Sequence, residues 1–282
     1  MNRKYFIIGL IFFSMLNSFQ LRAQQMTIAT FNLRYDNPRD TGNLWVDRMP
    51  IVASLIRFHG FDIFGTQEGL KNQLEDLKRA MPEFTYQGIG RDDGISKGEH
   101  SAIFYKHDKF ELKATGNFWL STTPDKPGPG WDAHLNRICT WVLLQPKSGG
   151  KAFYVFNAHY DHQGVEARKE SSKLILEKIK KIAGNTPVIF MGDLNGGHES
   201  EWYKLMASSG IMHDAYNLVQ DKYVNNGSFN GWGSRVTETD IIDHIFVSKD
   251  FTPTRYGILT DTYKGKYPSD HFPVMVQVKS EK

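Results

Sequence analysis

Short apolar runs, each bounded by polar or glycine-containing segments, recur along most of the chain. Runs of this length that are rich in β-branched and aromatic residues are typical of buried strands. The clearest begins with Pro187, Val188 and Ile189, and Gly192 marks its end. The pattern predicts strands at 26–33, 61–68, 102–105, 110–115, 138–144, 152–158, 187–191, 241–247 and 274–278.

A helical spacing of apolar residues appears between several of these strands. Leu70, Leu74, Leu77 and Met81 recur at intervals of four, three and four, which places them on one face of an amphipathic helix. The spacing predicts helices at 48–59, 70–81 and 165–182. Helices alternate with strands and no Ser/Gly-rich linker separates two halves, so we expect one α/β domain over residues 26–282.

Residues 1–25 follow a different pattern. Arg3 and Lys4 precede an apolar run at 6–15, and Ala23 offers a small residue at a cleavage position. This is the pattern of a cleaved secretory signal, and it predicts a secreted or periplasmic protein cut near Ala23. The apolar run is shorter than the roughly 20 residues that span a bilayer, so no transmembrane anchor is expected after cleavage.

Export changes the interpretation of the charge. The whole chain carries a formal net charge of +3, but Arg3, Lys4 and Arg22 all lie in the leader, which has no acidic residue. The mature chain is therefore close to neutral. It lacks the basic footprint of a protein that holds nucleic acid non-specifically, so we expect no stable nucleic-acid complex. We expect a monomer.

Polar side chains follow several of the predicted strands at the point where each strand ends. Alone, each of these residues is typical of a turn or of a satisfied polar group in the core. Together they indicate a site, because ligand sites in layered α/β proteins lie at strand ends. The set comprises Asn32, Glu68, His159, Asp193 and Asn195, with two further acid–histidine pairs at Asp243-His244 and Asp270-His271. If the chain stays extended after the strand at 187–191, Asp193 and Asn195 point to the same side.

These residue types suit metal-assisted hydrolysis of a phosphoester. Mg²⁺ prefers carboxylate, amide and water oxygens, and it leaves positions open for phosphate. Glu68 and Asp270, with Asn32, provide such ligands. The reaction also needs an oriented water and donors for the phosphate oxygens, for which Asp193, Asn195 and the histidines are suited.

The chain resembles the endonuclease/exonuclease/phosphatase superfamily, which includes DNase I-like nucleases, sphingomyelinases and inositol polyphosphate 5-phosphatases. The matching motifs are in the family's order and span almost the whole mature chain: FNLR (31–34), TQE (66–68), NAHYDH (157–162), GDLN (192–195), IDHIF (242–246) and SDHFP (269–273). The loop from Phe118 to Trp141 also resembles a secreted bacterial branch with deadenylase-like motifs. The implied fold is an α/β, four-layered sandwich of two mixed β-sheets flanked by helices.

The resemblance implies a role for each matching residue. Glu68 would be the principal ligand of Mg²⁺, for which Mn²⁺ or Ca²⁺ are possible substitutes, and Asn32 and Asp270 would complete the metal and phosphate cluster. Asp193 would activate or position the attacking water. Asn195 would orient water and phosphate.

The remaining implied roles concern the phosphate. His271, paired with Asp243, would contact the scissile phosphate, and His159 occupies the phosphate-binding histidine position. Glu99 is the candidate acid partner of His159. Arg137 is a candidate phosphate contact.

Two details leave alternatives open. The motif IDHIF has His244 where many members carry Tyr or Arg, so His244 either serves the site or only packs in its strand. Asp161 and His162 match the family branch, yet Asp161 is equally suited to cap the helix that starts at Val165.

We expect an exported Mg²⁺-dependent phosphodiesterase, with a phosphomonoesterase for sugar or inositol phosphates as the alternative. Two further alternatives come from different classes. A His-rich two-metal phosphoesterase would leave Glu68 and the SDH segment unused, and a silent binding module would have lost some of the site residues, none of which is missing.

The substrate class is open: nucleic acid, a phospholipid headgroup, or, for a monoesterase, a sugar or inositol phosphate. Residues in predicted loops that could stack on a base or sugar, or only tether the loops, are Trp45, Trp119, Trp131 and Trp232.

Overall fold

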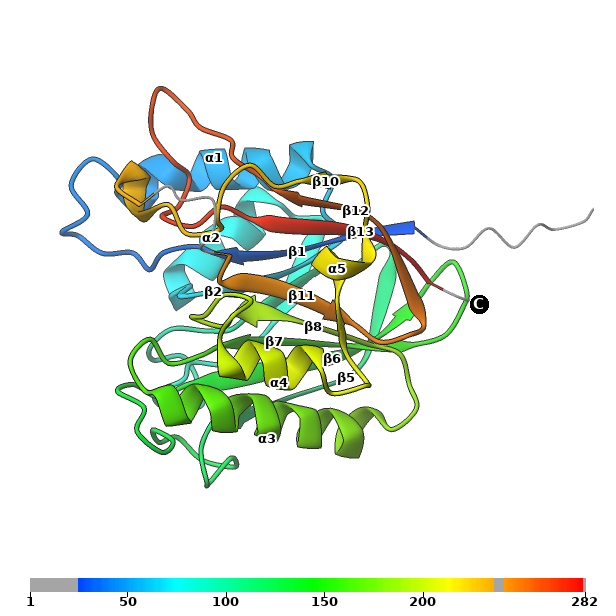
Figure 1. Ribbon diagram of the computed structural model, residues 1–282. Coiled ribbons are helices and arrows are strands. Elements are labelled where there is room, and N and C mark those ends of the chain that lie inside the picture. Colours follow the sequence, from blue (N-terminus) through cyan, green and yellow to red (C-terminus); the bar gives the residue numbers. More distant parts are fainter. Residues whose placement is uncertain (1–24, 236–240, 281–282) are drawn as a thin grey trace, which may run out of the picture.

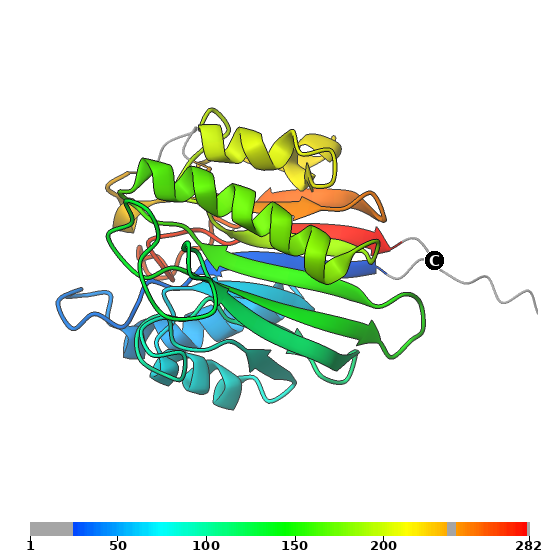
Figure 2. The ribbon, with the colours of Figure 1, turned by 90° about the horizontal axis from the view of Figure 1, so that it is seen from below.

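Two β-sheets pack face to face, and helices cover both outer faces (Figure 1, Figure 2). The computed structural model describes residues 25–235 and 241–280, so the predicted leader and its cleavage point lie outside the described residues. This is the four-layered sandwich that the sequence predicted. No helix in the described part of the chain is long and apolar enough to cross a membrane.

The first sheet has seven strands. In spatial order they are β10 (Lys222–Tyr223), β12 (Phe251–Ile258), β13 (Val274–Ser280), β1 (Gln25–Asn32), β2 (Ile63–Gln67), β4 (Ile103–Lys106) and β3 (Phe84–Gln87). The central pair, β1 and β2, is parallel, whereas β1 and β13 are antiparallel.

The second sheet repeats this plan with six strands. Their order is β5 (Phe110–Trp119), β6 (Ile138–Pro146), β7 (Phe153–His159), β8 (Val188–Asp193), β11 (Asp243–Val247) and β9 (His213–Asp214). Again one central pair, β7 and β8, is parallel, and β11 runs antiparallel beside β8.

The helices form the two outer layers. In Figure 1, α1 (Trp45–Phe58) lies at the top, and α3 (Val165–Ala183) and α4 (Glu201–Ala207) lie below the second sheet. The helix α2 (Lys71–Ala80) packs with α1 on the outer face of the first sheet. A short helix α5 (Ala215–Leu218) and a 3₁₀ turn η1 (Gly231–Gly233) lie in the connection to β11.

Alternation along β1 explains how one strand serves two cores. Met26 and Ile28 face the core between the sheets, while Ala29 and Phe31 face the core beneath α1 and α2. All four side chains are at most 1% exposed. Because both faces are buried, apolar side chains lie on both sides of the strand before Asn32 ends it.

Asp161 lies just before α3 and makes two kinds of contact. Its Oδ1 accepts the N–H groups of Gln163 and Gly164 before the helix, while Asp132 accepts those of Glu166 and Ala167 in the first turn. The N-cap of α3 is Gly164, so Asp161 shapes the turn that precedes the helix, and its Oδ2 also lies 3.4 Å from Arg137. Both roles considered for Asp161 stay predictions.

Two tryptophans do not lie in loops as predicted. Trp45 begins α1 and is 3% exposed, and Trp119 ends β5 and is 6% exposed. The Nε1 group of Trp45 donates to Asp76 of α2. Both rings are thus tethered by burial, as large aromatic rings commonly are.

Candidate active site

The parallel strand pairs bring the predicted polar residues to one edge of the sandwich, at the left of Figure 1. Asn32 ends β1 and Asp193 ends β8, and Glu68 directly follows β2. The Asn32 Nδ2 group lies 3.1 Å from Glu68 Oε1 and 3.0 Å from Asp193 Oδ2. Residues from both sheets therefore meet, as we expected from the positions of their strand ends.

Backbone turns aim two of these side chains. Glu68 and Asn195 have positive φ angles of 61° and 48°, a conformation that L-residues adopt uncommonly and that often occurs at functional sites. The extended path considered after the strand does not continue, because the chain turns at Asn195, yet the Asp193 and Asn195 side chains both reach His159 Nε2. The turn lets the Asn195 N–H donate to Asp193 Oδ1, and it places Asn195 Nδ2 3.1 Å from His159 Nε2.

His271 lies between two buried carboxylates. Its Nδ1 is 2.9 Å from Asp243 Oδ2, and its Nε2 is 3.8 Å from Asp193 Oδ2. Burial lowers the pKa of His271, but the charge of Asp243, its hydrogen bond and the charge of Asp193 outweigh burial and raise the pKa to about 10. His271 is therefore an imidazolium at neutral pH. The ligand atoms of Asp193, Asp243 and His271 lie within 4.8 Å of one another, close enough to hold a metal ion. The positive charge of the His271 imidazolium explains why the two carboxylates can lie so close together.

Asp193 has the properties of a general base. It is 1% exposed, and burial, reinforced by the charge of Asp243, raises the pKa of its carboxyl to about 7. A base with a pKa near the working pH is most effective at accepting a proton from water.

Glu68 and Asp270 form a second acidic group, with oxygen donors that fit a hard divalent cation. Glu68 Oε2 accepts the N–H of Tyr35 at 3.2 Å, and Asp270 lies 3.9 Å from the Nε of Arg34. Burial raises the pKa of Asp270 to about 6, and the charge of Glu68 contributes to this shift. Two facing carboxylates without sulfur or imidazole ligands are suited to Mg²⁺. Asn32 turns its amide nitrogen toward Glu68 while its oxygen accepts the Arg34 N–H, so here it orients the ligand, and its predicted part in metal binding stays a prediction.

His159 is held neutral. Burial, with the nearby charge of Arg137 and Arg91, lowers its pKa well below the ordinary value. The predicted partner Glu99 lies within ion-pair distance, with its Oε2 3.9 Å from His159 Nδ1, but its hydrogen bonds go to Arg91, which contacts both Glu99 oxygens at 2.6 and 2.8 Å. Arginine matches both oxygens of a carboxylate at once, so it takes this partner in preference to an imidazole.

Arg137 is positioned to receive an anion. Its side chain is 4% exposed, its Nε lies 3.4 Å from Asp161 Oδ2, and its Nη2 lies 3.1 Å from His162 Nδ1. Within the described residues, the buried Nη1 atom has no hydrogen-bond partner. A buried donor without a partner is costly, and a phosphate oxygen would satisfy it.

Arg48 is a supporting residue that the sequence did not indicate. It is fully buried and donates hydrogen bonds to the backbone carbonyls of Leu33, Arg34, Asn43 and Pro268. It therefore joins the segment after β1 to the segment that carries Asp270. From sequence it looked like an ordinary first residue of a surface helix.

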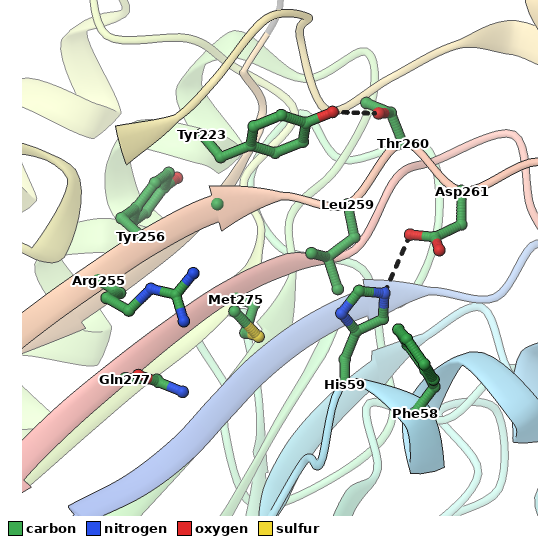
Figure 3. A pocket seen from close by; sticks show the side chains of 11 residues that line it. Phe58, His59, Tyr223, Arg255, Tyr256, Leu259, Thr260, Asp261, Met275 and Gln277 are labelled. Carbon is green, nitrogen blue, oxygen red and sulfur yellow. Dashed lines mark hydrogen bonds and ion pairs between the residues drawn. The ribbon is translucent and has the colours of Figure 1, made fainter. Parts of the chain in front are cut away.

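The site opens into a cleft of about 580 Å³, within the range for small-molecule ligands. Further residues that the sequence did not single out line it: Arg34, Tyr35, Leu135, Arg235 and Ile242. A second cavity of about 590 Å³ lies beside β12 and the end of α1 (Figure 3). Its described lining includes Arg255 and an ion pair between His59 and Asp261 at 3.1 Å, and among these residues it lacks the clustered carboxylates of the first cleft.

Comparison with known proteins agrees with this arrangement. The profile of the Endonuclease/Exonuclease/phosphatase family matches residues 29–271. The chain belongs to this family. Members of the Endonuclease/Exonuclease/phosphatase family are hydrolases that act on phosphoesters, and they typically use divalent metal ions. The chain is thus a phosphoester hydrolase of this superfamily.

Three solved structures of this family are similar over nearly their whole lengths. A family protein from Bacteroides thetaiotaomicron is 46% identical, covers 92% of this chain and 99% of its own, and superposes with a TM-score of 0.89. A mannosyl-6-phosphatase from the same organism is also 46% identical, with 90% and 99% covered and a TM-score of 0.87. A family protein from Bacteroides vulgatus is 37% identical, with 92% and 100% covered and a TM-score of 0.88.

Proposed function

We propose that this chain is a divalent-metal-dependent phosphatase that releases inorganic phosphate from a phosphorylated sugar. The cluster of Asp193, His271, Glu68 and Asp270 at the end of a small-molecule-sized cleft carries the proposal. The sequence alone favoured a phosphodiesterase, with a monoesterase for sugar or inositol phosphates as the alternative. The similarity to a mannosyl-6-phosphatase over 99% of that protein supports the alternative.

In the proposed reaction, Asp193 accepts a proton from a water as the water oxygen bonds to phosphorus. The ester P–O bond breaks, and the leaving sugar oxygen takes a proton from solvent. The Asn195 N–H holds Asp193 Oδ1 in place for this step. A protonated His271, kept charged by Asp243, donates from Nε2 to a phosphate oxygen. Arg137 offers its buried Nη1 to another.

Glu68 and Asp270 would hold the metal. Mg²⁺ bound there, or Mn²⁺ or Ca²⁺ in its place, would polarise the phosphate and neutralise part of its charge. Asn32 and the Tyr35 N–H keep the Glu68 carboxylate oriented. Neutral His159 lies 3.4 Å from Asp193 Oδ2 and adds a polar contact without a second positive charge.

A substrate panel tests the proposal. With Mg²⁺ present, we expect kcat/KM for hexose 6-phosphates and p-nitrophenyl phosphate to exceed that for bis-p-nitrophenyl phosphate by about tenfold or more. The reason is that a site which binds a dianionic phosphate loses contacts when a second phosphate oxygen is esterified. Inositol phosphates, sphingomyelin and nucleic acid complete the panel. Faster cleavage of the diester than of the monoester would instead establish the phosphodiesterase that the sequence favoured.

We expect the pH dependence of kcat/KM to reflect the ionisation of two groups. Activity needs Asp193 ionised, so kcat/KM should fall as the pH drops through about 7, and it needs His271 protonated, so kcat/KM should fall as the pH rises through about 10. Asp243→Asn removes the charge that raises the pKa of His271 and should move the alkaline fall to lower pH. The ratio of variant to wild-type kcat/KM, measured against pH, cancels ionisation of the substrate. An alkaline fall at the same pH in both proteins would contradict these roles.

A further inference from the structure

A second group of ligating side chains lies at the edge of the second sheet, behind the active site. His198 follows β8, Asp214 ends β9 and His244 lies on β11. Their ligand atoms all lie within 4.8 Å of one another. His244 and Asp214 are fully buried, while the His198 side chain is 28% exposed. The reaction described above uses none of the three.

The separations are those of metal ligands and are too long for hydrogen bonds. Asp214 Oδ2 is 3.5 Å from His198 Nε2 and 3.7 Å from His244 Nδ1, beyond the usual range of about 2.7–3.2 Å. Tetrahedral zinc with bonds of about 2.0–2.1 Å sets its ligand atoms roughly 3.4 Å apart. Among the described residues, neither of these two ring nitrogens has a hydrogen-bond partner, although both are buried. Asp214 Oδ2 thus lies near the spacing of zinc ligands from both ring nitrogens.

The protonation of His244 favours the same conclusion. Its Nε2 lies 2.9 Å from the backbone carbonyl of Gly196, which only accepts, so Nε2 carries the proton. Its other nitrogen, Nδ1, faces the Asp214 carboxylate and has no hydrogen-bond partner among the described residues. A metal ion placed between Nδ1 and Asp214 Oδ2 would bind both atoms. A histidine whose other nitrogen donates to a carbonyl is the arrangement typical of metal ligands.

Outer contacts hold the carboxylate in place. The Tyr203 hydroxyl donates to Asp214 Oδ2 at 2.8 Å, and Asn217 donates to the Tyr203 oxygen at 3.1 Å. Asp214 Oδ1 accepts the N–H of Tyr216 at 2.9 Å.

We propose that His198, Asp214 and His244 bind a second metal ion of the Zn²⁺ class, separate from the catalytic cation. Two imidazoles and one carboxylate select zinc or a similar transition metal over Mg²⁺. A water completes the coordination from the exposed side of His198. The metal joins the loop after β8, which carries Asn195, to the strand β11, which begins with Asp243. Its role is to stabilise the rear of the active site.

Cobalt titration tests the proposal without measuring activity. After the protein has been stripped with a strong chelator, Co²⁺ is added and the visible d–d absorption is followed. Tetrahedral coordination gives an intense band, whereas an all-oxygen octahedral site gives a weak one. We expect one Co²⁺ per chain to bind with the intense band, and we expect Zn²⁺ to displace it. The same band should persist in Glu68→Gln, which removes a ligand of the proposed catalytic site and so distinguishes the two metals.

Three variants complete the test. His198→Ala should abolish the band, and Tyr203→Phe, which removes only the outer contact, should weaken Co²⁺ binding by about 10–100-fold. His213→Ala is the matched control, because His213 neighbours Asp214 on β9 but does not belong to the group. Circular dichroism verifies folding, with His198→Asn as a substitute if the alanine variant does not fold. No intense band in the wild type, or an unchanged band in His198→Ala, would show that the group is only a polar network.

Discussion

Replacing Asp193 by asparagine is expected to lower kcat by about 10²–10⁴-fold, the range attributed to a general base. Asparagine has nearly the same shape and can still accept the Asn195 N–H, but it cannot take a proton from water. It also removes the carboxylate that lies 3.8 Å from His271. KM should change much less, because Arg137, His271 and the proposed metal ligands remain to bind phosphate. Steady-state kinetics with the best monoester of the panel measures both parameters.

A matched control separates this effect from general damage to a buried carboxylate. Asp62 is 5% exposed, precedes β2 at the end opposite to Glu68, and pairs with Lys106 and Lys109 at 3.2 and 2.7 Å. Asp62→Asn should reduce thermal stability but leave kcat close to that of the wild type. If a folded Asp193→Asn enzyme kept most of its turnover, Asp193 would not be the base.

The location of the site was predictable because it follows from backbone topology. Polar residues that end strands in a layered α/β fold gather at the carboxyl edge, and Asn32, Glu68, His159 and Asp193 do so. The contact between Asp243 and His271 was also anticipated, at 2.9 Å. Periodicity shows where strands end, and the matching motifs identify which ends carry the chemistry.

Individual side-chain partners were less predictable, because they depend on long-range packing. Glu99, the expected partner of His159, lies 3.9 Å from it, but the hydrogen bonds of Glu99 go to Arg91, whose planar donors match both of its oxygens. The extended path assumed for Asn195 was wrong, since local sequence does not reveal that its φ angle is positive. Arg48 donates a hydrogen bond to the carbonyl of Pro268, which is distant in the sequence, and no local sequence pattern predicts such a contact.

Short elements were missed for a related reason. The helix α4 has seven residues, too few for the 3.6-residue period to stand out. The strand β12 contains Pro253, which reads as a break, and the structure accommodates it with an irregular register between Pro253 and Arg255. These elements matter for function, because α4 carries Tyr203, which holds Asp214 of the proposed second metal site.

Removal of the catalytic metal is the second large effect that we expect. EDTA should abolish phosphate release and excess Mg²⁺ should restore it, because without a cation Glu68 and Asp270 present uncompensated negative charge to an incoming phosphate. Glu68→Gln should lower kcat/KM by about 10³-fold at moderate Mg²⁺, equivalent to several kcal/mol of transition-state stabilisation. Because glutamine keeps an oxygen that can accept the Tyr35 N–H, higher Mg²⁺ concentrations should recover part of the loss.

Glu99→Gln is the matched control for this metal experiment. Glu99 lines the same cleft, but both of its oxygens accept hydrogen bonds from Arg91, whose positive charge beside them disfavours a bound cation. Its replacement should leave the Mg²⁺ concentration for half-maximal activity unchanged, whereas Glu68→Gln should raise it. Turnover that persists in excess EDTA, or an equal shift in both variants, would mean that the carboxylates at this edge do not hold the catalytic ion. In that case Asp193 and His271 would have to act on phosphate without a cation bound at Glu68 and Asp270.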